Sequence, residues 1–170
     1  MAKSKADLWS YALAVYKREG VPEACLRLQD EFGADVPVLL YTLWMAAHGW
    51  QLDPPAMERV EAEIRTWRRD VVVPLRQVRR RLKTGPRPAP DARTETLRSA
   101  IKGAELSAEK IELETLSRIA FIPTQSARAK SPYQENLDLA IALYSGGRSV
   151  PEHLPATLLD AAREVAEEDA

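Results

Sequence analysis

Apolar residues recur every three or four positions along most of the chain, which predicts helices rather than strands. The longest such run extends from Pro54 to Lys83, with Asp53 as its N-cap and Gly85 as its stop signal. Its apolar stripe requires a core or a partner to cover it and consists of Met57, Val60, Ile64, Trp67, Val71, Leu75, Val78 and Leu82. Pro74 lies inside this run, lacks an N–H and crowds the preceding turn, so we expect the helix to bend or divide there.

Further segments with the same periodicity are bounded by capping residues, glycine or proline. They are residues 7–18, 21–32, 36–48, 91–122 and 133–144, and a last helix that begins near Pro155. The segment 36–48 is apolar nearly all round, follows Asp35 as an N-cap and is the predicted centre of the domain. We therefore predict an all-α fold, an irregular helical bundle of about six or seven helices with a proline-kinked central helix.

Two breaks divide the chain, a proline-rich connection at residues 85–90 and a polar loop at residues 123–132. We predict a helical core domain at residues 1–122 and a C-terminal helical extension at residues 123–170 that packs on the same domain. A chain of 170 residues with 45% hydrophobic composition can bury a substantial core. No apolar run reaches the roughly 20 residues that span a bilayer, so we expect a cytoplasmic protein that does not contact the membrane.

Positive charge is concentrated in the second half of the central run. Residues 65–87 carry nine Arg or Lys and one Asp, whereas the whole chain has a net charge of −1. On a helix, four of these cations form a basic ridge, namely Arg65, Arg69, Arg76 and Arg80. A later helix carries an acidic ridge, Glu105, Glu109 and Glu112. Three interpretations stay open: the ridges pair within the chain or across a dimer interface, the basic ridge is solvated, or it binds phosphate.

The chain contains one thiol, Cys25, and it can be matched with His48 as a nucleophile and base. Cys25 lies on the apolar face of a short helix, and His48 lies in the last turn of another, so burial and helix capping are the simpler explanations. Asp30 belongs to a polar helix corner whose spacing does not match a metal site. We expect no metal and no cofactor, and we expect Gln29 or Asp30 to hydrogen-bond the neighbouring aromatic side chains.

Aromatic residues are concentrated in the first 70 positions. At these spacings they fill a helical core, but they can also line an apolar ligand pocket. The pocket hypothesis involves Trp9, Tyr16, Cys25, Asp30, Trp44 and His48. It requires the polar members of this set to converge on one cavity.

Several segments, in this order, resemble a family of small proteobacterial helical proteins known only as a domain of unknown function. They are Trp9–Tyr16, Glu23–Asp30, Gly33–Val36, Leu43–Trp44, Pro74–Arg76 with Arg79–Lys83, and Lys102–Leu106. The resemblance covers roughly residues 7–120. It implies a helical, bacterial, cytosolic protein and supplies no activity.

The leading functional hypothesis is a non-enzymatic helical module for protein–protein interaction, either with another protein or as a homodimer. Its expected contact residues are Arg65, Arg69, Arg76, Arg79 and Arg80, with Trp67 as a buried support. One alternative is nucleic-acid binding through the ridge at residues 65–87. The other is a small-ligand protein or enzyme built on the aromatic N-terminal half.

Overall fold

The structure is a computed structural model of the chain, and it describes residues 7–119 and 132–168. Helices make up all of its regular secondary structure in these two ranges. They are α1 (Leu8–Tyr16), α2 (Val21–Phe32), α3 (Val36–Ala47), α4 (Pro54–Trp67), the π-helical turn η1 (Arg68–Val72), α5 (Val73–Arg81), α6 (Ala92–Ser117), α7 (Pro132–Ser145) and α8 (His153–Glu168). Every element in the described residues is helical, which confirms the predicted all-α fold. Three of the elements, α4, η1 and α5, follow one another directly and form one continuous helix.

Most helix ends follow the predicted capping residues. The Asp53 carboxylate accepts the Ala56 N–H at 2.8 Å at the start of α4, and Gly33, with a φ of +73°, ends α2. The predicted helix at residues 91–122 is shorter in the structure, because α6 ends at Ser117. The end of that prediction and most of the predicted loop at residues 123–132 lie outside the described residues.

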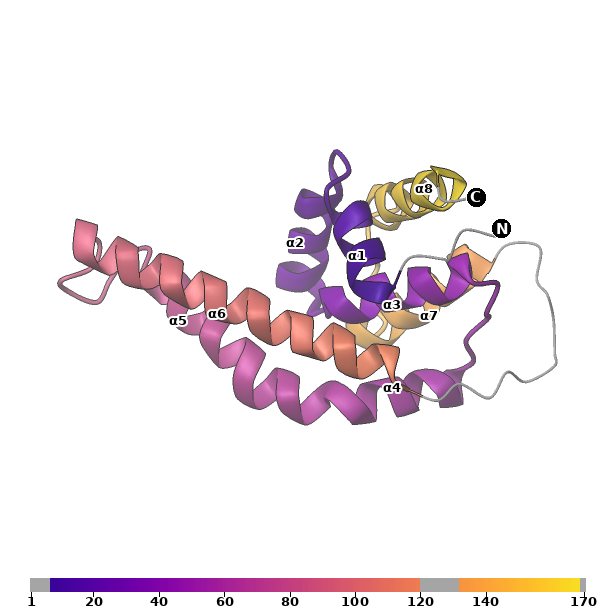
Figure 1. Ribbon diagram of the computed structural model, residues 1–170, viewed down its shortest axis with the longest axis horizontal. Helices are drawn as coiled ribbons and strands as arrows, with labels where there is room; N and C mark the ends of the chain where they lie inside the picture. The colour runs from indigo at the N-terminus through magenta and orange to yellow at the C-terminus, as the bar shows by residue number, and fades with distance from the viewer. Residues whose placement is uncertain (1–6, 120–131, 169–170) are drawn as a thin grey trace.

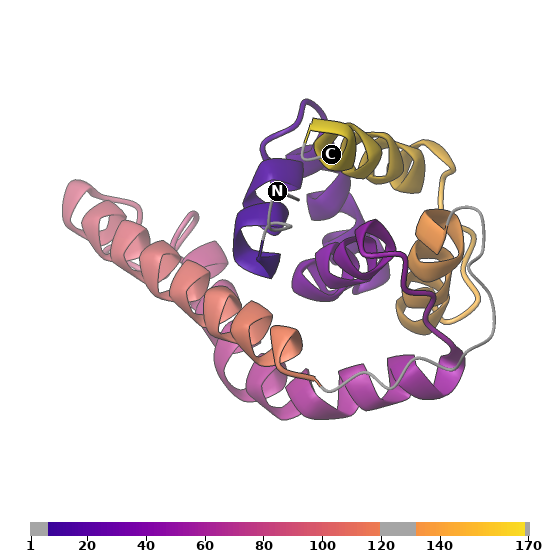
Figure 2. The ribbon, with the colours of Figure 1, turned by 45° about the vertical axis from the view of Figure 1, so that its right-hand side comes forward.

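The helices form a body from which one hairpin projects (Figures 1 and 2). The body contains α1, α2, α3, α7 and α8, together with α4 and the C-terminal half of α6. The hairpin, which we call the arm, consists of α5 and residues 92–104 of α6, and no residue in either part is buried. The arm therefore lacks a hydrophobic core of its own.

One hydrophobic core joins the N-terminal helices to the C-terminal ones. Side chains with no exposed surface come from both parts of the chain, including Val15, Val38, Leu39, Leu43, Leu116, Leu137, Ala140, Leu158 and Ala162. Arg148 adds a polar link, because its guanidinium donates to the carbonyl oxygens of Glu31 at 2.5 Å and Phe32 at 3.0 Å. These carbonyls end α2, where a cation also meets the negative end of the helix dipole.

Asn136 is a fully buried polar clamp between α7 and the loop that follows α3. Its amide oxygen accepts the Leu52 N–H at 2.8 Å. Its amide nitrogen donates to the carbonyl oxygens of Thr42 at 3.1 Å and Trp50 at 2.9 Å. This one side chain thus satisfies three backbone groups that come from the predicted core domain.

Asn136→Ala is expected to lower the free energy of unfolding by about 2–4 kcal/mol, because buried backbone groups lose their partners and a small cavity forms. Urea denaturation followed by circular dichroism measures the change. Gln134→Ala, on the exposed side of the same helix, is the control and should cost less than about 0.5 kcal/mol. Equal effects of the two substitutions would contradict the role given to Asn136.

Candidate functional site

The central helix contains a π-helical turn, η1, immediately before Pro74. The Val73 N–H donates to the carbonyl oxygen of Arg68, five positions earlier, at the end of this turn. Such a turn holds one extra residue, so the side chains that follow are rotated by about 100° relative to an uninterrupted α-helix. The predicted bend is also present, since the helix changes direction between α4 and α5 (Figure 1).

The rotation divides the predicted apolar stripe into two parts. Met57, Val60 and Ile64 are at most 2% exposed and belong to the core. Val72, the last residue of the π-helical turn, is buried at 1% exposure, while Val78 on the former stripe is 48% exposed. The second half of the stripe therefore contributes no buried residue to the core: Val71, Leu75 and Leu82 are half-buried, and Val78 is exposed.

Arg68, the first residue of the turn, is the centre of a buried charge cluster. Its Nη1 lies 2.8 Å from Asp35 Oδ2, 3.0 Å from Glu61 Oε2 and 3.0 Å from the Tyr144 hydroxyl. Its Nη2 also donates to Glu61, and the Tyr144 hydroxyl donates to Glu61 at 2.8 Å. Asp35 precedes α3 as predicted, but the capping bond expected of its side chain is absent. The prediction was wrong on this point because Arg68 binds that carboxylate.

The acids around Arg68 differ in their protonation behaviour. Burial raises the pKa of Glu61, but hydrogen bonds from Arg68 and Tyr144 outweigh burial and hold it below its usual value. Glu112 on α6 has no exposed surface, and no N–H or hydroxyl donor of the described residues reaches its carboxyl oxygens. Burial, followed by the negative charge and hydrogen bonding of Asp35, raises the pKa of Glu112 well above its usual range. Glu112 therefore retains its proton at neutral pH.

The predicted pairing of the two charged ridges occurs within the chain for Arg76. Its Nε lies 2.9 Å from Glu105 Oε1, and its Nη2 lies 2.8 Å from Glu109 Oε1. Arg79 pairs with Glu105 as well. Because their side chains are only 12% and 18% exposed, Arg76 and Arg79 form an internal seam between α5 and α6.

The remaining predicted contact arginines do not continue this seam. Arg65 lies 3.7 Å from Glu61, Arg69 pairs with its neighbour Asp70 at 2.6 Å, and Arg80 pairs with Asp30 on α2. The basic ridge expected from an uninterrupted helix is therefore not a single surface. Trp67, expected as a support, donates its Nε1–H to the Ala108 carbonyl oxygen at 3.0 Å and ties α4 to α6.

The polar residues of the pocket hypothesis do not converge. Cys25 is 1% exposed, and burial raises the pKa of its thiol to about 12. Asp30 pairs with Arg80 on the arm, whereas the His48 ring packs against Trp44 at a tilt of 52°, with centroids 4.4 Å apart. The expected hydrogen bonds from Gln29 or Asp30 to the aromatic rings are also absent, since the Gln29 amide lies 3.5 Å from Asp30 instead. These contacts do not support a thiol–imidazole catalytic site.

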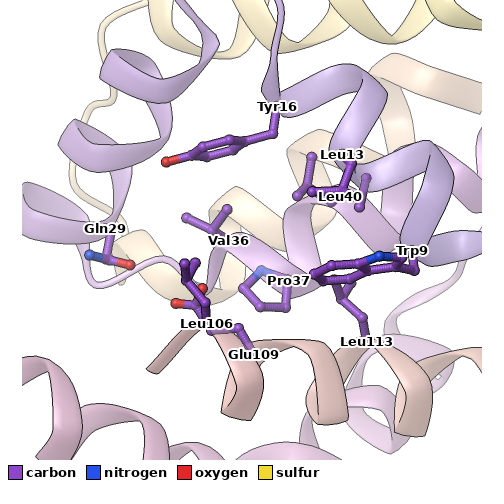
Figure 3. A pocket seen from close by; sticks show the side chains of 11 residues that line it. Trp9, Leu13, Tyr16, Gln29, Val36, Pro37, Leu40, Leu106, Glu109 and Leu113 are labelled. Carbon is purple, nitrogen blue, oxygen red and sulfur yellow. The ribbon is translucent and has the colours of Figure 1, made fainter. Parts of the chain in front are cut away.

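Trp9 and Tyr16 do line a pocket, which lies between α1, the start of α3 and α6 (Figure 3). Its volume is about 140 Å³. The walls are mostly apolar and include Leu13, Val36, Leu40, Leu106 and Leu113. Gln29, Glu109 and the hydroxyl of Tyr16 are polar groups on the side chains that line it (Figure 3).

The arm carries a second hollow, which we call the arm groove. It is shallow, has a volume of about 300 Å³ and is lined by Asp70, Val71, Pro74, Leu75, Val78 and Ile101. Leu97, about one helical turn before Ile101 on α6, is 51% exposed. Basic side chains near the tip of the arm, among them Arg81, Lys83 and Arg87, are exposed and form no ion pair with the described residues.

Sequence reasoning missed the residues that organise the buried cluster, namely Arg68, Glu61 and Tyr144. A signal was present for Glu112, because it lies at four-residue spacing between Ala108 and Leu116, which are both buried. Within the part of the chain that the structure describes, no group of three His, Cys, Asp or Glu is arranged to hold a metal ion. No helix in that part is long and apolar enough to cross a membrane.

The fold and these contacts define an all-α protein with a projecting helical arm. Residues 7–116, more than half of the chain, match the family described as "Protein of unknown function (DUF2390)". The chain belongs to this family, as the resemblance of its N-terminal segments predicted. No curated protein and no solved structure matches it.

Glu112→Gln tests the buried acid, because it keeps the side-chain shape and removes the titration. The folded chain retains the Glu112 proton, whereas the unfolded chain releases it above a pKa near 4.5. The stability of the wild type relative to the variant therefore falls as pH rises. We expect similar free energies of unfolding at about pH 4 and a more stable variant at about pH 8, with a gap that grows by up to about 1.4 kcal/mol per pH unit.

Urea denaturation at a series of pH values measures this gap. Glu114→Gln, an exposed change on the same helix, is the control and should follow the wild type at every pH. A pH-independent difference between Glu112→Gln and the wild type would contradict a raised pKa of Glu112.

Proposed function

We propose that this protein is a non-enzymatic protein–protein interaction module that forms a homodimer by packing two arms against each other. The observation that carries the proposal is the outward rotation of the second half of the apolar stripe. It leaves Val78 on α5 48% exposed, and Leu97 on α6 is 51% exposed as well. Neither helix has a buried residue in the arm. Apolar surface on a coreless hairpin is typical of a protein-binding face.

The arm groove has the composition of an interface centre. Its lining is apolar except for Asp70 at the end nearest the body. Exposed Arg81 and Lys83 follow the groove at the end nearest the tip. An apolar centre with a charged rim is the usual anatomy of a protein interface.

The charges at the two ends support a second copy of the chain as the occupant. In an antiparallel pairing, Asp70 of one copy faces Arg81 of the other, and the same contact is repeated by the two-fold axis. Leu75 then lies close to this axis, and the four helices of two arms form a small bundle. The two ends of the groove are thus complementary to each other in charge.

Nucleic-acid binding through residues 65–87 receives less support. Arg76 and Arg79 are already neutralised by Glu105 and Glu109, so a phosphate would have to displace internal ion pairs. The groove beside them is apolar and offers no phosphate ligand. The groove is therefore better suited to a protein than to a phosphate backbone, and the unpaired cations Arg81, Lys83 and Arg87 lie beyond it, near the tip of the arm.

Val78→Glu should raise the dimer dissociation constant at least about tenfold, because it places an unpaired charge in an apolar interface. Sedimentation equilibrium gives this constant directly. Leu26→Glu is the matched control, since Leu26 is 51% exposed on α2 in the body, and it should leave the constant unchanged. Circular dichroism verifies that both variants remain helical.

Charge reversal tests the antiparallel register. Asp70→Arg and Arg81→Glu should each weaken the dimer, and the double variant should restore it, because both charges are then exchanged across the two-fold axis. A wild-type chain that sediments as a monomer up to millimolar concentration would refute the proposal. Weakening by both single reversals without restoration by the double variant would refute the register.

A further inference from the structure

The pocket beside Trp9 is separate from the arm groove and contains a distinct set of polar groups (Figure 3). We infer that it binds a compact apolar amine, with the hydrocarbon part between Trp9 and Tyr16 and the ammonium group on Glu109. This inference concerns a second site and does not depend on dimerisation.

The size and the walls of the pocket determine the apolar part of the ligand. A volume of about 140 Å³ is close to that of apolar cavities that hold a benzene-sized molecule. Leu13, Val36 and Leu40 supply aliphatic surface between the two aromatic residues (Figure 3). A ligand of this size has few atoms, so one strong polar contact has to fix its orientation.

Glu109 is placed to make that contact. Its Oε1 accepts a hydrogen bond from Arg76 Nη2 at 2.8 Å, outside the apolar walls. Its Oε2 has no hydrogen bond with any described residue, and the side chain is 23% exposed. The second oxygen can therefore accept from an ammonium group, while Arg76 holds the carboxylate in position.

Glu109 itself favours a cation over an anion. It is the carboxylate that borders the pocket, and Arg76 is its direct counterion, while Arg79 also pairs with Glu105 and Arg68 pairs with Asp35. Burial raises the pKa of Glu109, and Glu105 and Asp35 raise it further against the effect of Arg76. A ligand ammonium is attracted to the Glu109 carboxylate, whereas a ligand carboxylate is repelled by it. Lys110 Nζ already lies 5.1 Å from the centroid of the Trp9 ring, so the ligand ammonium is expected on Glu109 and not on this ring.

Calorimetric titration with benzylammonium and with benzyl alcohol tests the inference, because the two probes share a shape and differ in charge. Benzylammonium should bind the wild type at least about tenfold more tightly, as expected for one charge-assisted hydrogen bond. Glu109→Gln should remove this preference while leaving the affinity for benzyl alcohol unchanged. Glu114→Gln, exposed on the same helix, should leave both affinities unchanged.

A second pair of variants tests the location. Leu106 borders the pocket and is 52% exposed, while Leu97 on the same helix is 51% exposed and lies on the arm. Leu106→Trp should abolish binding of both probes by filling the mouth of the pocket, and Leu97→Trp should have no effect. The inference is overturned if the wild type binds neither probe, binds both equally, or responds equally to the two tryptophan substitutions.

The outcomes for the pocket and for the arm are independent. Variants at Val78, Asp70 and Arg81 change the sedimentation result and do not border the pocket. A chain that binds benzylammonium as a monomer would refute the homodimer and support the pocket. A chain that dimerises without binding either probe would refute the pocket and support the homodimer.

Discussion

The burial of one guanidinium, that of Arg68, is the constraint on which the rest of the structure depends. A charge that is mostly removed from water needs partners of opposite charge and complete hydrogen bonding. Arg68 finds them in Asp35 before α3, Glu61 on α4 and Tyr144 on α7. Loss of one partner would leave a buried charge uncompensated, so these contacts hold the helices in one relative arrangement.

The same residue begins the π-helical turn, so the buried cluster coincides with the change of side-chain register. Before the turn, the central helix contributes apolar residues to the core. After it, Arg76 and Arg79 face α6 and form an ionic seam with Glu105. A half-buried ionic seam contributes less stability than an apolar one of equal area, but it defines which helix faces pair. The arm is consequently held by charges on its inner side and presents apolar surface on its outer side.

Local signals in the sequence were sufficient for most helix boundaries. Asp53, Gly33 and Asp91 act within one helical turn, so their role can be recognised without knowledge of the fold. Asp35 shows the limit of such signals, because a distant arginine competed successfully for its carboxylate. The grouping of Glu112 with the acidic ridge failed for a related reason. Exposure depends on what packs against a helix, and the pattern within that helix does not specify it.

The sequence by itself determined that the chain is helical, where most helices begin and that the central helix is disturbed at Pro74, because hydrophobic period, caps and proline act over a few residues. Only the tertiary structure decided which half of the apolar stripe is buried and which arginine is central. Tyr144 lies 76 positions from Arg68, and no local pattern records that proximity. The one extra residue of the π-helical turn rotates every later side chain of the central helix by about 100°, and this rotation determines which residues of the arm face α6.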